Sequence, residues 1–132
     1  MVQSSVVLDT NVFVAAGFNR ESSSARLIEE IRKGNLRLVW NEATRKESRS
    51  VVERIPSLSW EPFGDLFREE GRCEARIVPE EIDYVPDLDD RKFAALARAT
   101  DAALITNDDD LLANRGEAEV YIVSPYEYFG RR

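Results

Sequence analysis

Histidine is absent from this 132-residue sequence. Histidine is the residue used most often for acid–base catalysis near neutral pH and for binding zinc, so histidine-based hydrolysis and structural zinc are excluded. The single cysteine, Cys73, cannot form a disulfide within the chain, which agrees with a reducing compartment. The glycines form neither GxGxxG nor GxxxxGK[ST], and no GxSxG is present, which excludes nucleotide-cradling loops and the serine-hydrolase elbow.

Long apolar runs are also missing. No run approaches the roughly 18 residues that span a bilayer, and the first residues lack the layout of a signal peptide. We therefore expect a cytoplasmic protein with no membrane contact, folded as one domain over residues 1–132. Carboxylates are abundant: 25 acidic against 18 basic residues give a net charge of −7. This charge repels nucleic acid, so a nuclease of this composition would need a metal or a local basic surface.

Short apolar runs alternate with amphipathic segments along the chain. The runs typical of buried parallel strands lie at residues 5–8, 36–40, 103–106 and 120–123. Helices are predicted over residues 22–33, 41–55, 60–72 and 89–100, and from 124–125 onward. Residues 75–78 are a candidate short strand, and 80–88 resemble an acidic loop. The alternation predicts an α/β fold, a three-layer α/β/α sandwich with a mostly parallel central sheet.

Carboxylates follow two of the predicted strands. Asp9 comes directly after residues 5–8, and Asp108 follows residues 103–106. Because the carboxyl ends of parallel strands lie at one edge of a sheet, we expect the two carboxylates to converge. Each has a local alternative, since Asp9 can cap the next helix and Asp108 can cap a helix that begins at Asp109.

Glu47 lies among apolar residues on its predicted helix. At about 100° per residue it shares a face with three of them: Ala43, Val51 and Ile55. Burying an unpaired carboxylate is costly, so a metal, a position at the rim of the core or a basic partner must compensate. Arg26 and Arg45 are the candidate partners, and Glu42 points elsewhere on the helix.

Asp90 gives the same result on the later helix. It shares a face with Phe93, Ala94 and Ala97, whereas Asp89 is turned about 100° away. The alternative is that Asp90 simply interacts with the helix amino terminus, as any acid in a first turn does.

Four acids from separate segments suit a hard divalent cation, which prefers oxygen ligands. Such a site activates water and offsets the charge that develops on a phosphoryl group. Phosphodiester hydrolysis fits this chemistry.

The sequence resembles the PIN-domain ribonucleases, in particular the VapC-type toxins, through four blocks that span nearly the whole chain. These are VVLDTN at residues 6–11, EATRKE at 42–47, DRKF at 90–93 with Ala97, and TNDDDL at 106–111. The resemblance implies that the catalytic, metal-binding acids are Asp9, Glu47, Asp90 and Asp108. It also implies Asp110 as a fifth ligand, with orienting roles for Thr10, Asn11 and Thr106. It further implies Mg²⁺ or Mn²⁺ as cofactor, RNA as substrate, a homodimer, and an antitoxin that blocks the site.

Cations near the acids are the candidates for holding the RNA backbone: Arg45, Arg49, Arg91 and Lys92. The alternative is that they are solvated helix charges. The sequence contains no interleaved basic and aromatic residues of the kind that stack on bases, so it does not indicate which RNA sequence is bound.

Two other functions stay open. An aspartate-based phosphotransfer or phosphatase domain also places an Asp at the end of its first strand. The dehalogenase type would need a second Asp where Asn11 stands, and the response-regulator type would need paired acids before Asp9, where residues 1–8 hold none. The second alternative is a catalytically weak PIN-like module that docks a basic partner.

Overall fold

A sheet of four parallel strands lies at the centre of the part of the chain that the computed structural model describes, residues 4–75, 77, 85, 88–117 and 119–130. The strand order is β2-β1-β3-β4. The strands are β1 (Ser4–Leu8), β2 (Leu36–Leu38), β3 (Ala103–Ile105) and β4 (Ile122–Val123). The prediction of a mostly parallel sheet is confirmed, although β2 and β4 are shorter than the apolar runs that predicted them.

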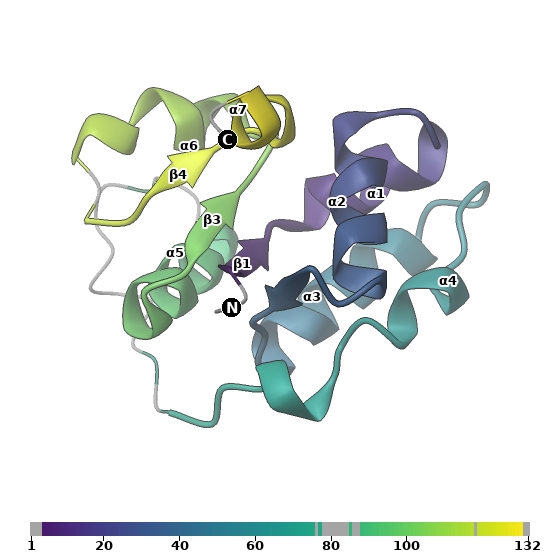
Figure 1. The fold of residues 1–132 in the computed structure, drawn as a ribbon, viewed down its shortest axis with the longest axis horizontal. Coiled ribbons are helices and arrows are strands. Elements are labelled where there is room, and N and C mark those ends of the chain that lie inside the picture. Colours follow the sequence, from purple (N-terminus) through teal and green to yellow (C-terminus); the bar gives the residue numbers. More distant parts are fainter. Residues whose placement is uncertain (1–3, 76, 78–84, 86–87, 118, 131–132) are drawn as a thin grey trace.

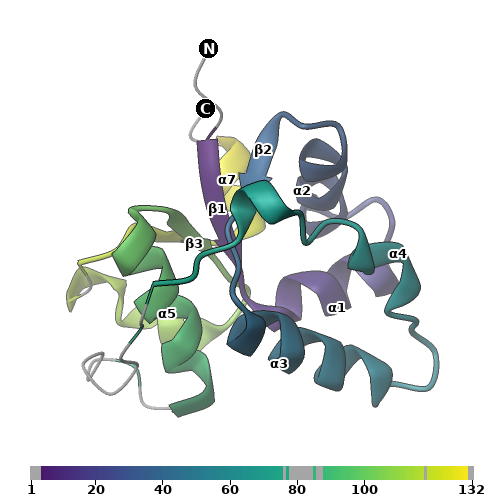
Figure 2. The ribbon, with the colours of Figure 1, turned by 90° about the horizontal axis from the view of Figure 1, so that it is seen from below.

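Helices cover both faces of this sheet (Figures 1 and 2). Val6 and Leu8 of β1 pack into the core on one face, and Val7 packs into the core on the other, as expected for a strand buried on both sides. The first face carries α1 (Thr10–Phe18), α2 (Ser23–Arg32), α3 (Glu42–Glu53) and α4 (Glu61–Gly64), with α7 (Pro125–Gly130) packed against α2. The second carries α5 (Leu88–Thr100) and α6 (Asp109–Ala113).

The helix α3 contacts both α1 and α5, so it joins the two helical layers beyond the carboxyl ends of the strands (Figure 2). Its amino terminus is fixed by reciprocal hydrogen bonds between Asn41 and Thr44, a capping box. The start of α2 is capped by Ser22, whose hydroxyl accepts from the Ala25 N–H. The predicted helices over 22–33, 41–55 and 89–100 are thereby confirmed, and α7 starts at the predicted proline.

The predicted helix over residues 60–72 is wrong in extent. The chain forms the short α4 and then a 3₁₀ turn, η1 (Glu69–Gly71). A Cβ at Gly71 would lie 1.9 Å from the Leu38 carbonyl oxygen, so the backbone here runs directly against β2. Its carbonyl accepts from the Trp40 N–H at 3.0 Å. These tertiary contacts replace a continued helix, while the side chains predicted to face inward do pack into the core: Phe63, Leu66 and Phe67.

Two segments fall outside the sequence predictions or outside the described chain. The sequence predicted no bounds for α1, because apolar residues occur on all sides of this helix and give no periodic signal. The predicted strand over 75–78 and acidic loop over 80–88 lie mainly outside the described residues. Within the described part, no helix combines the length and the apolar character that a membrane span requires.

Candidate active site

Asp9 directly follows β1 at the carboxyl edge of the sheet and is 3% exposed. One carboxylate oxygen accepts from the Thr10 N–H at 2.8 Å. The other accepts from the Thr106 hydroxyl at 2.8 Å and from the Asn11 side-chain amide at 3.3 Å. Parallel pairing of Leu8 with Ile105 brings β1 and β3 to the same edge and so puts Thr106 beside Asp9. The carboxylate is therefore held rigidly by groups from two strand ends.

Burial raises the pKa of Asp9 from its ordinary 3.8 to about 6, against the hydrogen bonds from Thr106 and Thr10, which lower it. The negative charges of Asp108 and Glu47 raise it further. Asp9 thus lies within the electrostatic field of two other acids, one from the loop after β3 and one from α3. A cation at this position would relieve the unfavourable charge of all three.

Glu47 lies on the side of α3 that faces Asp9. It lines a pocket together with Val51 and Ile55, as the helical spacing predicts, but Ala43 is exposed. The Glu47 side chain is 21% exposed, and its Oε1 accepts from the Lys92 ammonium of α5 at 3.0 Å. The basic partner of Glu47 is thus Lys92, and neither of the two arginines that the sequence suggested.

The fully buried line of α3 is one residue further along than the predicted apolar face. It consists of Thr44, Ser48 and Val52. The Ser48 hydroxyl lies 3.0 Å from the Thr10 hydroxyl at the start of α1, and both residues are buried. This contact fixes α3 against the strand end that carries Asp9. The sequence did not identify Ser48 as a site residue, because its burial depends on a hydrogen bond. The available signal was the four-residue spacing of the two polar residues Thr44 and Ser48.

Asp108 caps α6, as its local alternative predicts. Its Oδ1 accepts from the Asp110 N–H at 3.0 Å, and its own N–H donates to the Thr106 hydroxyl at 2.9 Å. The same hydroxyl donates to Asp9, so Thr106 links the two carboxylates. Asp108 therefore both caps α6 and raises the pKa of Asp9 through its negative charge. Asp110 is exposed, and its carbonyl accepts from Asn114.

Asn107 is a further residue that the candidate set lacked. Its backbone N–H donates to the Asn11 side-chain oxygen at 2.9 Å, and its own side-chain amide donates to the buried Ser24 hydroxyl at 3.2 Å. These bonds join the loop after β3 to α1 and α2. A polar residue shortly after a predicted strand indicated a candidate site residue, and Asn107 meets this criterion as clearly as Asn11 does.

Asp90 lies in the first turn of α5. The face on which it was placed is buried, with Phe93, Ala94 and Ala97 all nearly inaccessible. Phe93 also lines the pocket beside Asp9. The Asp90 side chain lies outside the described set, so its role stays a prediction.

The four cations predicted to bind RNA all have partners within the protein. Arg45 pairs with Glu42 at 3.4 Å and Arg49 with Glu53 at 3.1 Å. The Arg91 guanidinium donates to the Val85 carbonyl at 2.6 Å, and Lys92 pairs with Glu47. Their contact with RNA stays a prediction.

The pocket beside Asp9 has a volume of about 350 Å³. Its polar end is formed by Asp9, Thr10, Asn11 and Glu47, and its apolar wall by Val14, Val51, Ile55 and Phe93. An anionic end next to an apolar wall suits a ligand whose charged part binds through a cation.

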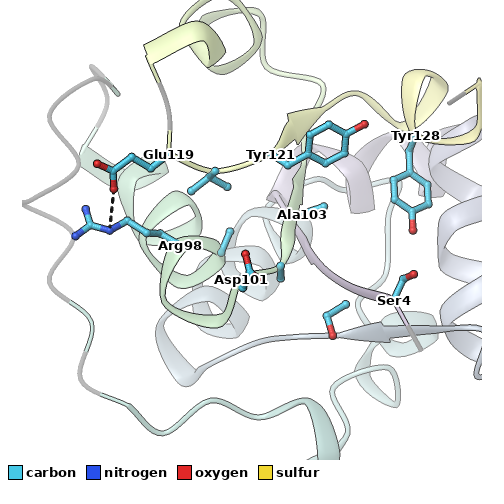
Figure 3. A pocket seen from close by; sticks show the side chains of 11 residues that line it. Ser4, Arg98, Asp101, Ala103, Glu119, Tyr121 and Tyr128 are labelled. Carbon is cyan, nitrogen blue, oxygen red and sulfur yellow. Dashed lines mark ion pairs between the residues drawn. The ribbon is translucent and has the colours of Figure 1, made fainter. Parts of the chain in front are cut away.

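A second pocket of similar size lies at the opposite edge of the sheet, where β1 and β3 begin (Figure 3). Its acids are Asp101 and Glu119, and Glu119 pairs with Arg98 at 3.6 Å. The carboxylates that influence Asp9 come from the other edge, so the candidate site is the pocket at the carboxyl ends of the strands.

The donor set at this site fits Mg²⁺ or Mn²⁺, because hard divalent ions prefer carboxylate oxygens and the site contains no thiol. Among the described residues, no three acids or thiols are already arranged around one point as ligands. Glu47 is directed to Lys92 and Asp108 to its helix cap. Each of these two contacts occupies one oxygen of the carboxylate.

Comparisons with known proteins agree with the fold described above. A family model described as a PIN domain matches residues 5–110. No curated protein matches the chain. The structure of FitAB bound to an IR36 DNA fragment is similar, with 15% identity, a TM-score of 0.62, and coverage of 92% of this chain and 95% of that one. PAE2754 from Pyrobaculum aerophilum is similar with 16% identity, a TM-score of 0.59, and coverage of 98% and 88%. At these identities the likeness shows a shared fold.

Proposed function

This chain belongs to the PIN domain family, and we propose that it is a metal-dependent ribonuclease that hydrolyses RNA phosphodiester bonds as the toxin of a type II toxin–antitoxin pair. The observation that supports the chemistry most strongly is Asp9, a buried carboxylate whose pKa is raised to about 6 beside Glu47 and Asp108. The four motif blocks shared with VapC-type toxins support RNA as substrate, a homodimer and an antitoxin partner.

The proposed cofactor is Mg²⁺ or Mn²⁺. Its ligands would come from Asp9, Glu47, Asp90 and Asp108, with Asp110 as a further candidate. When bound, such an ion polarises a water molecule for attack and offsets negative charge on the phosphoryl oxygens. Because the net charge of −7 repels nucleic acid, a cation among these acids would favour the approach of RNA.

The protein's own residues orient the site. Thr106 and Asn11 donate to one oxygen of Asp9, and the Thr10 N–H donates to the other, so the carboxylate cannot rotate away from the pocket. Val51 and Ile55 form an apolar wall next to the acids, against which a ribose or base can pack and exclude water. The reacting phosphodiester would then lie between this wall and the carboxylates.

Cleavage of a mixed single-stranded RNA, with and without metal, tests the proposal. We expect cleavage in Mg²⁺ or Mn²⁺ and none in EDTA. Glu47→Gln should lose activity by at least about a hundredfold while the protein keeps its fold, measured by circular dichroism. Glu42→Gln is the matched control, since Glu42 is exposed on the same helix.

Three results would overturn the proposal. Cleavage that persists in EDTA would show that the reaction needs no metal. A Glu47→Gln protein as active as the parent would show that Glu47 is not part of the site. A covalent aspartyl-phosphate at Asp9 would identify a phosphotransfer reaction instead.

A further inference from the structure

An ion pair between α3 and α5 includes Glu47, one of the residues of the proposed metal site. Lys92 and Glu47 are 45 positions apart, and their charged atoms are 3.0 Å apart. The side chains are 24% and 21% exposed, so both are largely removed from water. Glu47 lines the pocket with Asp9 and contributes to the raised pKa of that residue. The ammonium of Lys92 therefore lies beside the group of acids proposed to bind the ion.

The positive charge of Lys92 partly offsets the negative charge of the acids in this pocket. Among the described residues, it is the cation that forms an ion pair with a carboxylate lining this pocket. An ammonium neutralises one charge through donors about 3 Å away, whereas a divalent ion brings two charges and binds oxygen at about 2.1 Å. An ion placed among the acids would therefore compete with Lys92 for Glu47.

The flexible lysine side chain suits such an exchange. An ammonium is a compact charge on a four-carbon stem with rotatable donors, so it can leave one carboxylate without disturbing the backbone. An arginine with a rigid, planar pairing would be harder to displace.

We propose that Lys92 is a positioning residue that holds Glu47 in the metal-free protein and yields this carboxylate to the divalent ion. The inference rests on the proposed metal-dependent function. Lys92 keeps the site folded and partly neutral without metal, and it lowers the affinity for metal by the cost of breaking its ion pair. This role differs from direct RNA contact, because it requires the ion pair with Glu47 to break when the metal binds.

Mn²⁺ binding to the full-length protein without RNA, measured by calorimetry, tests the inference. Lys92→Met should bind Mn²⁺ about five- to tenfold more tightly than wild type, the scale set by one partly buried ion pair. Lys92→Arg, which keeps a positive charge, should bind Mn²⁺ no more tightly than wild type. Lys46→Met is the matched control: it removes an exposed lysine next to Glu47 in sequence, and its affinity should change less than twofold.

Stability in EDTA provides a readout independent of metal. A double-mutant cycle of Lys92→Met and Glu47→Gln in urea denaturation should show favourable coupling between the two residues. Zero coupling, or Mn²⁺ affinity that is unchanged or weaker in Lys92→Met, would overturn the role of Lys92 and leave the metal site intact. Failure of wild type itself to bind Mn²⁺ would overturn the proposed function and this inference with it.

Discussion

Asp9→Asn should raise the stability of the protein relative to wild type as the pH increases through 6, while it removes the central carboxylate from the site. Burial raises the pKa of Asp9 from 3.8 to about 6 in the folded state. Because the folded-state pKa is above the unfolded value, the contribution of Asp9 to stability is complete below about pH 4 and is lost as the pH rises through 6. At about 1.4 kcal/mol per pKa unit, the loss by pH 8 is on the order of 3 kcal/mol.

The asparagine variant lacks this titration, so its free energy of unfolding should rise relative to wild type by about 3 kcal/mol between pH 4 and pH 8. Its amide NH₂ cannot accept the bonds from Thr106 and Asn11 that one carboxylate oxygen accepts, which costs a constant amount at every pH. The difference between the two pH curves is therefore the diagnostic quantity, and its value at a single pH is less informative.

Urea denaturation in EDTA at fixed ionic strength measures these curves, with fluorescence of the two buried tryptophans, Trp40 and Trp60, as the probe. Adding Mg²⁺ at pH 8 should then stabilise wild type more than Asp9→Asn, since only an intact site binds the ion well. Parallel pH curves for the two proteins would refute the reasoning, because they would show that Asp9 pays no desolvation cost on folding.

Three further substitutions test other contacts by their effect on the free energy of unfolding. Ser48→Ala should lower it by about 1–2 kcal/mol, because a buried hydroxyl on α1 loses its partner. Gly71→Ala should lower it by about 3 kcal/mol or prevent folding, because its Cβ would collide with the Leu38 carbonyl oxygen. Thr106→Val keeps the side-chain shape but removes a donor that lowers the pKa of Asp9, so the pH-dependent loss of stability should extend to higher pH.

Two controls accompany these substitutions. Ser50→Ala changes an exposed serine on the same helix and should alter stability by less than about 0.5 kcal/mol. Gly64→Ala places a Cβ at an ordinary 3.7 Å from its nearest neighbour, so it should be tolerated. Equal effects of Ser48→Ala and Ser50→Ala would contradict the buried contact, and a stable Gly71→Ala protein would contradict the close approach to β2.

The strand ends could be predicted from the sequence because an apolar run that stops at a polar residue is a local signal. Asp9 and Thr106 follow such runs, and their parallel strands bring them into contact. Glu47 was also placed correctly with Val51 and Ile55, since helical periodicity needs only the spacing of residues.

The contacts that fix the site could not be predicted in this way. The buried line of α3 contains Thr44 and Ser48, whose burial depends on hydrogen bonds that a hydrophobic pattern does not reveal. Lys92 meets Glu47 across 45 residues, whereas spacing along one helix reveals only close neighbours. The break in the predicted helix over 60–72 has the same origin, because it depends on the approach of Gly71 to another strand.

The central claim is a divalent metal site centred on Asp9. The most direct test is an anomalous diffraction experiment on crystals soaked in Mn²⁺, at a concentration that saturates RNA cleavage by the same protein. We predict an anomalous peak about 2.1 Å from a carboxylate oxygen of Asp9, with further ligands from Glu47, Asp90 and Asp108. Mn²⁺ bound only elsewhere, with the Asp9 carboxylate free of the ion, would contradict the account.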